Sequence, residues 1–585
     1  MDFLVKIPKL NQKSNQVTVY QWFIQEGEEV KSGDPLLEVT SDKTNVRVEA
    51  EVNGTVKEIM VSEGEKAKLN QAVCKLETTE TVSKDKPKSS PKDKDTSKTS
   101  GSDESQFNYF GSLLGKKEPE KESKEVDLCI LGGGPGGYTA AIRAAKAGLS
   151  VALVEKDNLG GTCLNRGCIP TKALIQSANL LSQINSAENF GITTDAVIGD
   201  FSKAVSYKDN VVTTLKDGVA NLLANNQVSV ISGEGQLKSS TEVTVEADNK
   251  IVNITAKNII LATGSKPKLP PIEGIEHENV LTSTELLNLK ELPSKMVIIG
   301  GGVIGMELSF ILNKFGVDVT VVEAMDHILP YMDKQIGEEI KISAEEQGIN
   351  IITGAFAKEI SQVENGGLMI TLTKNEEQLK VFGNQILVAI GRDFNTKALN
   401  ATELGLDTTK QGAIQVDKHL KTSLDNVYAI GDVIGGYLLA HEASHEAIVA
   451  VDNILGIEKQ INYDNIPSAV FTDPEAAQVG LTQKEAKDMG YQVKTAEFPF
   501  SSNGKVLTTQ KLSGFSKLVV NSTDNVILGG SLVGVGATEL IHQIAIAVTN
   551  QLTVEQLTNT VFAHPTVSET IFESSLAFFG EEIHG

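Results

Sequence analysis

Cysteine, tryptophan and basic residues are scarce in this chain of 585 residues. Four cysteines are too few for a disulfide-stabilised scaffold. Acidic residues outnumber basic ones by 76 to 53, and the formal charge of −23 argues against nucleic acid as a partner. No stretch reaches the roughly 18 consecutive apolar residues of a membrane span, and the opening MDFLVKIPKL has no secretory or transit pattern. We expect a cytoplasmic protein with no membrane or nucleic-acid partner; an organellar protein that has lost its leader is the open alternative.

The first 77 residues contain short runs that alternate apolar and polar residues, namely VTVYQWFI, LLEVT, VRVEAEV and TVKEIMV. They also contain a quasi-repeat, because QEGEEVKSGDPLLEVT (25–40) aligns with SEGEKAKLNQAVCKLE (62–77). This alignment places Gly27 on Gly64 and Leu37 on Cys74. The repeat predicts a flattened, all-β barrel with two similar halves, in which Cys74 is a core residue without a redox role.

Residues 78–124 are rich in Lys, Asp, Ser and Pro and have almost no apolar periodicity. This composition is typical of a flexible linker. The apolar island FNYFGSLLG (107–115) inside it predicts either a docking segment or an ordinary collapsed stretch, with no preference between them.

Two segments after residue 124 follow the order strand, glycine turn, helix, strand. Each turn is followed 23 residues after its first glycine by a glutamate that can accept hydrogen bonds from a ribose. The residues of the two motifs are Gly132, Gly134, Gly137 and Glu155 in the first, and Gly300, Gly302, Gly305 and Glu323 in the second. The pattern predicts two Rossmann-like dinucleotide sites. A carboxylate at position 323, with no arginine in EAMDH, favours NAD over NADP in the second site.

Two cysteines, Cys163 and Cys168, stand in GGTCLNRGCIPTK just after the first glycine turn. In a regular helix five residues rise about 7.5 Å, beyond the roughly 4.4–6.8 Å between the Cα atoms of a disulfide. If the pair bonds, the segment must be distorted, and its glycines supply the freedom. Two unrelated buried thiols are the alternative, and burial is what we expect for Cys129 in its apolar strand.

A histidine and a carboxylate, His564 and Glu569, are five residues apart in HPTVSE near the C-terminus. The carboxylate can hydrogen-bond the ring, fix its tautomer and raise its pKa, which suits an acid/base pair.

The dithiol beside two nucleotide motifs resembles the pyridine nucleotide–disulfide oxidoreductase family. GGTCLNRGCIPTK, GGGVIGMEL, FTDPEAAQVG and FAHPTVSE resemble its dihydrolipoamide dehydrogenase branch. Residues 1–77 resemble a lipoyl domain, with the Asp42-Lys43 pair at the attachment site and Gly54 eleven residues later. The resemblance implies FAD in the first nucleotide site, NAD in the second, a lipoyl group on Lys43, and no metal.

The family motifs imply further cofactor-binding residues. They are Thr263 and Gly264 in ATGS, Gly391 in VAIGRDFNT, Asp432 in YAIGD as the ligand of the ribityl chain, and Lys172 paired with Glu307 beside the flavin and nicotinamide.

The implied fold is multidomain: an all-β lipoyl barrel, then α/β with two Rossmann-like domains, then an α+β dimerisation domain. The implied segments are a lipoyl domain (1–77), a flexible linker (78–124), an FAD-binding domain (125–270), an NAD-binding domain (271–392), a central domain completing the FAD site (393–465) and a dimerisation domain (466–585).

The implied reaction is oxidation of protein-bound dihydrolipoamide to lipoamide with reduction of NAD⁺ to NADH. Cys163 would be the sulfur attacked by substrate, Cys168 the thiol next to the flavin, and His564 the acid/base group oriented by Glu569. In the family this dyad completes the partner's site, so a homodimer is implied. The fused lipoyl domain implies a 2-oxo acid or acetoin dehydrogenase complex with an acyltransferase core.

Other members of the family fit less well. A glutathione reductase needs a 2′-phosphate pocket that Glu323 opposes, and a mercuric reductase needs additional cysteine pairs. A single-cysteine peroxidase or oxidase would lack Cys163. A lipoyl carrier or assembly subunit without catalysis is the alternative from another class, and the presence of all four catalytic residues disfavours it.

Overall fold

The computed structural model describes residues 2–7, 16–31, 34–40, 45–50, 52–69, 71–78, 120–195, 197–247, 250–364 and 366–585. The chain forms two units, Met1–Leu114 and Gly115–Gly585, which are described separately. Lys43, the island 107–115 and most of the predicted linker lie outside the described residues. No helix in the described part of the chain is long and apolar enough to cross a membrane.

The N-terminal unit consists of two four-stranded antiparallel sheets around one apolar core. One sheet has the order β1 (Asp2–Lys6), β8 (Ala72–Glu77), β6 (Gly54–Ile59), β3 (Glu29–Val30), and the other the order β5 (Asn45–Glu49), β4 (Pro35–Thr40), β2 (Gln16–Trp22), β7 (Lys66–Lys68). The two orders correspond strand by strand. Gly27 and Gly64 both have positive φ, 93° and 83°, while Leu37 and Cys74 are both fully buried. The predicted barrel with two similar halves is confirmed.

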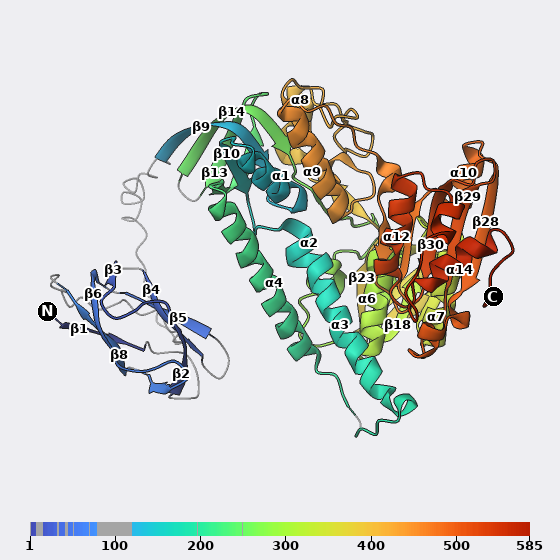
Figure 1. Cartoon of the computed structure of the whole chain (residues 1–585), viewed down its shortest axis with the longest axis horizontal. Coiled ribbons are helices and arrows are strands. Elements are labelled where there is room, and N and C mark those ends of the chain that lie inside the picture. The colour runs from blue at the N-terminus through green and yellow to red at the C-terminus, as the bar shows by residue number, and fades with distance from the viewer. Residues whose placement is uncertain are drawn as a thin grey trace, which may run out of the picture. The chain divides into compact units, whose positions relative to one another are not determined.

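The second unit begins with a sheet whose strands come from two distant parts of the chain (Figure 1). Its order is β11 (Ser229–Ser232), β10 (Val151–Glu155), β9 (Glu120–Leu131), β14 (Lys250–Leu261), β13 (Glu242–Ala247), β12 (Glu234–Leu237), and β25 (Val427–Ala429) pairs with β14. The associated helices are α1 (Pro135–Lys146), α2 (Gly161–Arg166), α3 (Cys168–Asn185), α4 (Phe201–Asn225), α8 (Ala401–Leu404) and α9 (Ala440–Ile454). The strands β11, β10, β9, β14 and β25 run parallel, as a Rossmann-like sheet requires.

Helix α1 begins at Pro135, inside the first glycine turn, because proline is accommodated at the first position of a helix. One boundary differs from the sequence prediction. Strand β9 begins at Glu120, inside the predicted linker, and pairs with β14 from its first residue. The run EKESKE that starts it is charged at every position except Ser123 and lacks the alternation of apolar and polar residues by which strands are recognised.

The second nucleotide fold is a five-stranded parallel sheet. Its order is β16 (Val280–Thr282), β23 (Gln385–Val388), β17 (Lys295–Ile299), β18 (Asp318–Val322), β19 (Asn350–Ile352). It carries helices α5 (Ser283–Leu286), α6 (Val303–Lys314) and α7 (Lys334–Glu346), an antiparallel sheet of β20 (Phe356–Gln362), β21 (Leu368–Lys374) and β22 (Glu377–Gly383), and the pair β15 (Ser265–Pro267) and β24 (Arg392–Phe394).

The C-terminal part is a five-stranded antiparallel sheet covered by helices. Its order is β26 (Ser468–Val470), β27 (Ala476–Gly480), β30 (Ile527–Val533), β29 (Phe515–Asn521), β28 (Val493–Pro499), and its helices are α10 (Gln483–Asp488), α11 (Gly504–Leu507), α12 (Ala537–Thr549), α13 (Val554–Thr558) and α14 (Glu569–Ala577). One apolar core contains Leu174 of α3, Phe310 of α6 and Val470 of β26. Helices α3 and α6 lie side by side in this region (Figure 1). This shared core fixes the position of α3 relative to α6 and to the C-terminal sheet.

Candidate active site

The two cysteines of the dithiol motif lie on either side of a break between helices. Cys163 is in α2, Gly167 adopts a non-helical conformation (φ −143°, ψ −112°), and Cys168 is the first residue of α3. The distortion required by the five-residue spacing is therefore present. Both side chains are half-buried, and each thiol changes the pKa of the other.

The environment shifts the pKa values of the two thiols in opposite directions. The hydrogen bond from Cys163 lowers the pKa of Cys168 to about 7 against the opposing effect of burial, and the charge of Lys172 adds to the lowering. The same hydrogen bond and burial raise the pKa of Cys163. Burial alone raises the pKa of Cys129 to about 12. Cys168 is thus the thiol prepared to exist as a thiolate near neutral pH.

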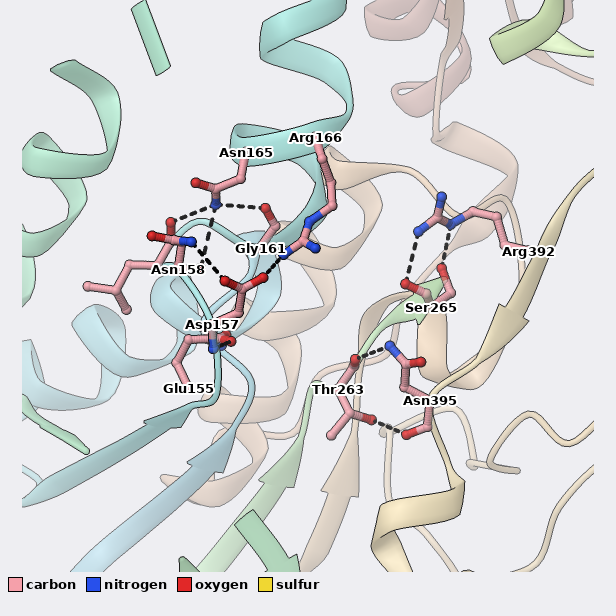
Figure 2. A network of polar contacts seen from close by, with 12 residues as sticks. Glu155, Asp157, Asn158, Gly161, Asn165, Arg166, Thr263, Ser265, Arg392 and Asn395 are labelled. Atoms are coloured by element: carbon pink, nitrogen blue, oxygen red, sulfur yellow. Dashed lines mark hydrogen bonds and ion pairs between the residues drawn. The ribbon is translucent and has the colours of Figure 1, made fainter. Parts of the chain in front are cut away.

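Local contacts hold the turn that precedes Cys163 (Figure 2). The Asn165 side-chain amide donates to the carbonyl oxygens of Leu159 (3.0 Å) and Gly161 (2.9 Å), and Arg166 pairs with Asp157. Gly161 has φ +57°, and a Cβ there would lie 2.6 Å from Gly134 Cα. The dithiol segment is therefore packed directly against the first glycine turn.

The two glycine turns have the same construction. In the first, a Cβ on Gly132 would lie 2.2 Å from Ala262 O; in the second, a Cβ on Gly300 would lie 2.3 Å from Ala389 O. A Cβ on Gly137 would lie 1.8 Å from Gly132 O, and a Cβ on Gly305 would lie 2.0 Å from Gly300 O. Only glycine fits these positions, so each helix N-terminus stays open for the close approach of a pyrophosphate.

The two acidic residues that follow these turns also correspond. Glu155 accepts from the amides of Gly133 (2.6 Å) and Asp157 (2.8 Å). Glu323 accepts from the amides of Gly301 (2.6 Å) and Met325 (2.8 Å). Burial raises the pKa of Glu155, although the Gly133 amide opposes this effect. Both carboxylates are therefore fixed beside their glycine turns, where a ribose is expected.

Hydrogen bonds join the motif ATGS to VAIGRDFNT at two places (Figure 2), and Asp432 of YAIGD binds Ser265. Thr263 Oγ1 donates to Asn395 O (2.9 Å), and Asn395 Nδ2 donates back to Thr263 O (3.0 Å). Ser265 Oγ donates to Asp432, and Arg392 donates to Ser265 through Nε (2.5 Å) and Nη2 (2.9 Å). Gly264 and Gly391 have positive φ, 69° and 127°. The sequence prediction missed the roles of Ser265, Arg392 and Asn395, although all three stand inside the motifs that carried it.

Lys172 of α3, which is partly exposed, and the buried Glu307 of α6 form an ion pair. Lys172 Nζ lies 2.9 Å from both carboxylate oxygens, and the Glu307 side chain is only 5% exposed. The Phe471 amide donates to Glu307 Oε1 (3.0 Å), and the Phe471 ring lies 4.3 Å from Lys172 Nζ. Phe471 was not predicted, and its only signal was its position at the start of FTDPEAAQVG.

His564 and Glu569 form a hydrogen-bonded pair, with 2.9 Å between Nδ1 and Oε1. Burial opposes ionisation of Glu569, but the Thr566 amide and the His564 ring keep the pKa of Glu569 below its ordinary value. The His564 side chain is 79% exposed. Within the part of the chain that the structure describes, neither residue lines the cavity that contains the cysteines. The structure therefore does not bring this pair together with the dithiol of the same subunit.

One cavity of about 2980 Å³ connects the other elements of the site. Its lining includes both glycine turns, Cys163, Cys168, Lys172, Glu155, Glu307, Glu323 and Asp432. A typical small-molecule site has about 300–1,000 Å³. The cavity therefore has room for two dinucleotides, and the two glycine turns and the carboxylates of Glu155 and Glu323 line it.

Comparison with models of known protein families assigns the chain to a family. The model described as pyridine nucleotide-disulphide oxidoreductase matches residues 126–447, and the model of that family's dimerisation domain matches residues 466–575. The chain belongs to this family. As a member it uses FAD and a pyridine nucleotide, which agrees with the cavity. Residues 4–76 match a third model, for biotin- and lipoyl-carrying domains, described as biotin-requiring enzyme.

Individual relatives cover nearly all of the chain outside the N-terminal unit. The chain is 41% identical over 463 residues to a dihydrolipoyl dehydrogenase of Chlamydia pneumoniae, covering 79% of this chain and 99% of the relative. It is 39% identical over 462 residues to that of Bacillus subtilis, covering 79% and 98%.

Solved structures give the same result for the fold. The Cu(II) complex of the HOCl-induced flavoprotein disulfide reductase RclA from Escherichia coli is similar with a TM-score of 0.70 and 31% identity, covering 78% of this chain and 99% of that one. LpdA from Mycobacterium tuberculosis is similar with a TM-score of 0.72 and 29% identity, covering 77% and 99%.

Proposed function

We propose that the chain is a dihydrolipoyl dehydrogenase, which oxidises a dihydrolipoyl group and reduces NAD⁺. The observation that carries this proposal is the helix break between Cys163 and Cys168, in a cavity shared with two dinucleotide turns and the Lys172–Glu307 pair. In the balanced reaction the dihydrolipoyl dithiol becomes a disulfide, its two electrons and one proton reach NAD⁺ as a hydride, and the other proton is released. When bound, FAD supplies the two-electron relay between the dithiol and the nicotinamide.

The chain's own residues prepare the sulfur chemistry. Cys163 and Cys168 start as a disulfide, and the substrate thiolate attacks Cys163 to form a mixed disulfide and release Cys168 as a thiolate. A pKa of about 7 makes Cys168 a good leaving group at neutral pH. The second substrate thiol then displaces Cys163 and closes the lipoyl ring. Lys172 lies where its charge stabilises the Cys168 thiolate.

We assign the proton transfers to His564, with Glu569 fixing the ring through Nδ1 so that Nε2 faces the substrate. The dyad is exposed and lies outside the cavity of its own subunit. Supported by the match to a dimerisation domain, we propose that it completes the site of the partner subunit in a homodimer.

We predict that the enzyme prefers NAD⁺ to NADP⁺ by at least about 100-fold in kcat/KM, or ~2.7 kcal/mol. The fixed carboxylate of Glu323 accepts two backbone amides and would repel a 2′-phosphate. The variant Glu323→Gln removes this charge, so the preference should fall to about tenfold or less. Initial rates of reduction of both nucleotides by free dihydrolipoamide test this prediction. Equal rates with the two nucleotides in the unaltered enzyme would contradict it.

We further propose that Lys43 carries a lipoyl group, and that the protein serves a 2-oxo acid or acetoin dehydrogenase complex with an acyltransferase core. Lys43 itself lies outside the described residues, between Thr40 and Asn45 in the sequence. Thr40 is the last residue of strand β4 and Asn45 the first of strand β5, and these two residues pair with each other. The fused barrel would hold its lipoyl group near the enzyme at a high local concentration.

Buried free thiols at Cys74 and Cys129 suit a reducing compartment, which supports a cytoplasmic enzyme.

The lipoyl assignment predicts the result of a single substitution. In cells able to lipoylate, the intact mass of the protein should show one lipoyl addition, and Lys43→Arg should remove it completely because arginine offers no ε-amine. The control is Lys57→Arg, an exposed lysine on strand β6, which should keep the addition. A lipoyl addition that persists in Lys43→Arg would show that another lysine is the attachment site.

A further inference from the structure

Helices α3 and α6 and the segment 471–473 are joined at two levels. At the first level Lys172 of α3 and the Phe471 amide both bind Glu307 of α6. This level lines the cavity with the dithiol and the nucleotide turns.

The second level repeats this arrangement two helical turns away. Asn179 and Lys314 each follow their first-level counterparts, Lys172 and Glu307, by seven residues, or roughly 10.5 Å along a helix. Lys314 Nζ lies 2.6 Å from Asn179 Oδ1 and 2.6 Å from Asp473 Oδ2. The second level thus joins the same two helices and the same segment. Here the positive charge, Lys314, lies on α6, and the negative charge, Asp473, lies on the segment.

Asp473 is the centre of this second level. Its other carboxylate oxygen binds Lys511 Nζ (2.8 Å), and its carbonyl oxygen accepts from Gln347 Nε2 (2.7 Å). The Lys314 side chain is 6% exposed and that of Asp473 18%. Burial opposes the charge of Asp473, but Lys314 and Lys511 keep its pKa below the ordinary value. Asp473 is therefore a charged anchor for the segment that carries Phe471.

The second level has no direct access to the reaction. Asn179, Lys314 and Asp473 do not line the cavity of the dithiol, as far as the described residues define it. The space around Lys314 and Asp473 is instead bounded by apolar side chains, among them Ile175, Phe310 and Phe471. Any effect of Asp473 on the dithiol must pass through Phe471 and the Lys172–Glu307 pair.

We propose that Asp473 is a positioning residue that holds Lys172 and Glu307 in place beside Cys168 by anchoring Phe471; this inference rests on the function proposed above. Release of Asp473 frees the segment, so Glu307 loses the Phe471 amide and Lys172 loses the Phe471 ring. Lys172 then moves away from the Cys168 sulfur.

The test measures the Cys168 thiolate directly. In a Cys163→Ser enzyme with bound flavin, the long-wavelength absorbance of a thiolate beside flavin is titrated against pH, with and without Asp473→Asn. The pKa that this titration reports is influenced by residue 163, Lys172 and Glu307, and Arg392 also interacts electrostatically with Cys168. We expect Asp473→Asn to raise the apparent pKa of Cys168 by about one unit, which lowers the thiolate fraction at neutral pH about fivefold.

Asp452→Asn is the matched control. Asp452 is also a buried aspartate between two cations, Arg143 and Lys459, but it joins α1 and α9 rather than α3 and α6. A purely structural effect of losing a buried carboxylate should appear in both variants, whereas the titration should move only with Asp473→Asn. An unchanged titration in folded Asp473→Asn, or an equal shift in Asp452→Asn, overturns the inference.

A milder variant covers the case in which Asp473→Asn does not fold. Lys511→Gln removes the more exposed of the two cations, 39% exposed, and leaves the Lys314 contact. It should shift the titration in the same direction by a smaller amount, and no shift overturns the inference. Failure of the proposed function is separate, because a Cys163→Ser enzyme with intact Asp473 would then show bound flavin without any thiolate band.

Discussion

Replacing Cys163 by serine should lower dihydrolipoamide oxidation at least about 10⁴-fold. The substrate thiolate must attack a sulfur to form the mixed disulfide, and serine offers none. Cys163 is on a short helix held by Asn165 and packed against Gly134, so the substitution leaves the turn and the flavin site intact. NADH formation from free dihydrolipoamide, normalised to bound flavin, measures the effect.

The matched control is Cys74→Ala in the N-terminal barrel. Cys74 is fully buried in the core of that unit, and burial raises its pKa to about 11. Its loss should leave the rate with free dihydrolipoamide unchanged within about twofold. Substantial activity in Cys163→Ser would rule out the proposed disulfide pathway.

Replacing His564 by glutamine should lower the same rate by about 10²–10⁴-fold, the usual contribution of an acid/base group. Glutamine keeps a polar side chain but cannot exchange the proton of the substrate thiol. The Thr566 amide keeps the pKa of Glu569 below its ordinary value, so the Glu569 carboxylate is too weak a base to replace His564. Steady-state rates over a range of pH measure the loss.

A mixed dimer tests whether the dyad acts across subunits. Refolding Cys163→Ser with His564→Gln produces dimers in which one site has both an intact cysteine pair and an intact dyad, if the dyad comes from the partner. Such dimers should recover up to about half of the activity per dimer, while each variant alone stays inactive. Absence of recovery in verified mixed dimers would place the dyad in its own subunit's site.

Spacing along the sequence predicted the local features of the site. The five-residue spacing of the two cysteines predicted, for a pair able to bond, a distortion such as the break seen at Gly167. The repeat at 25–40 and 62–77 predicted the two corresponding sheets. These features follow from backbone geometry within a few residues. Lys43 and the linker remain predictions, because they lie outside the described residues.

Contacts between distant segments could not be predicted in this way. Phe471 reaches Glu307 across 164 residues, and Lys314 reaches Asp473 across 159. Strand β25 (Val427–Ala429) joins a sheet whose other strands all come from the segment between Glu120 and Leu261. No local pattern encodes such partners, because they are determined by how α3, α6 and the C-terminal sheet pack around their shared core.

The central claim is that dihydrolipoamide passes two electrons through the dithiol of this chain to NAD⁺. An anaerobic titration of the flavin-loaded enzyme with dihydrolipoamide, followed by NAD⁺, tests it most directly. The account predicts a long-wavelength thiolate–flavin band that grows with substrate and is discharged as NADH forms. A bound flavin that does not respond to dihydrolipoamide but is reduced by NADPH would contradict it and indicate a different disulfide reductase.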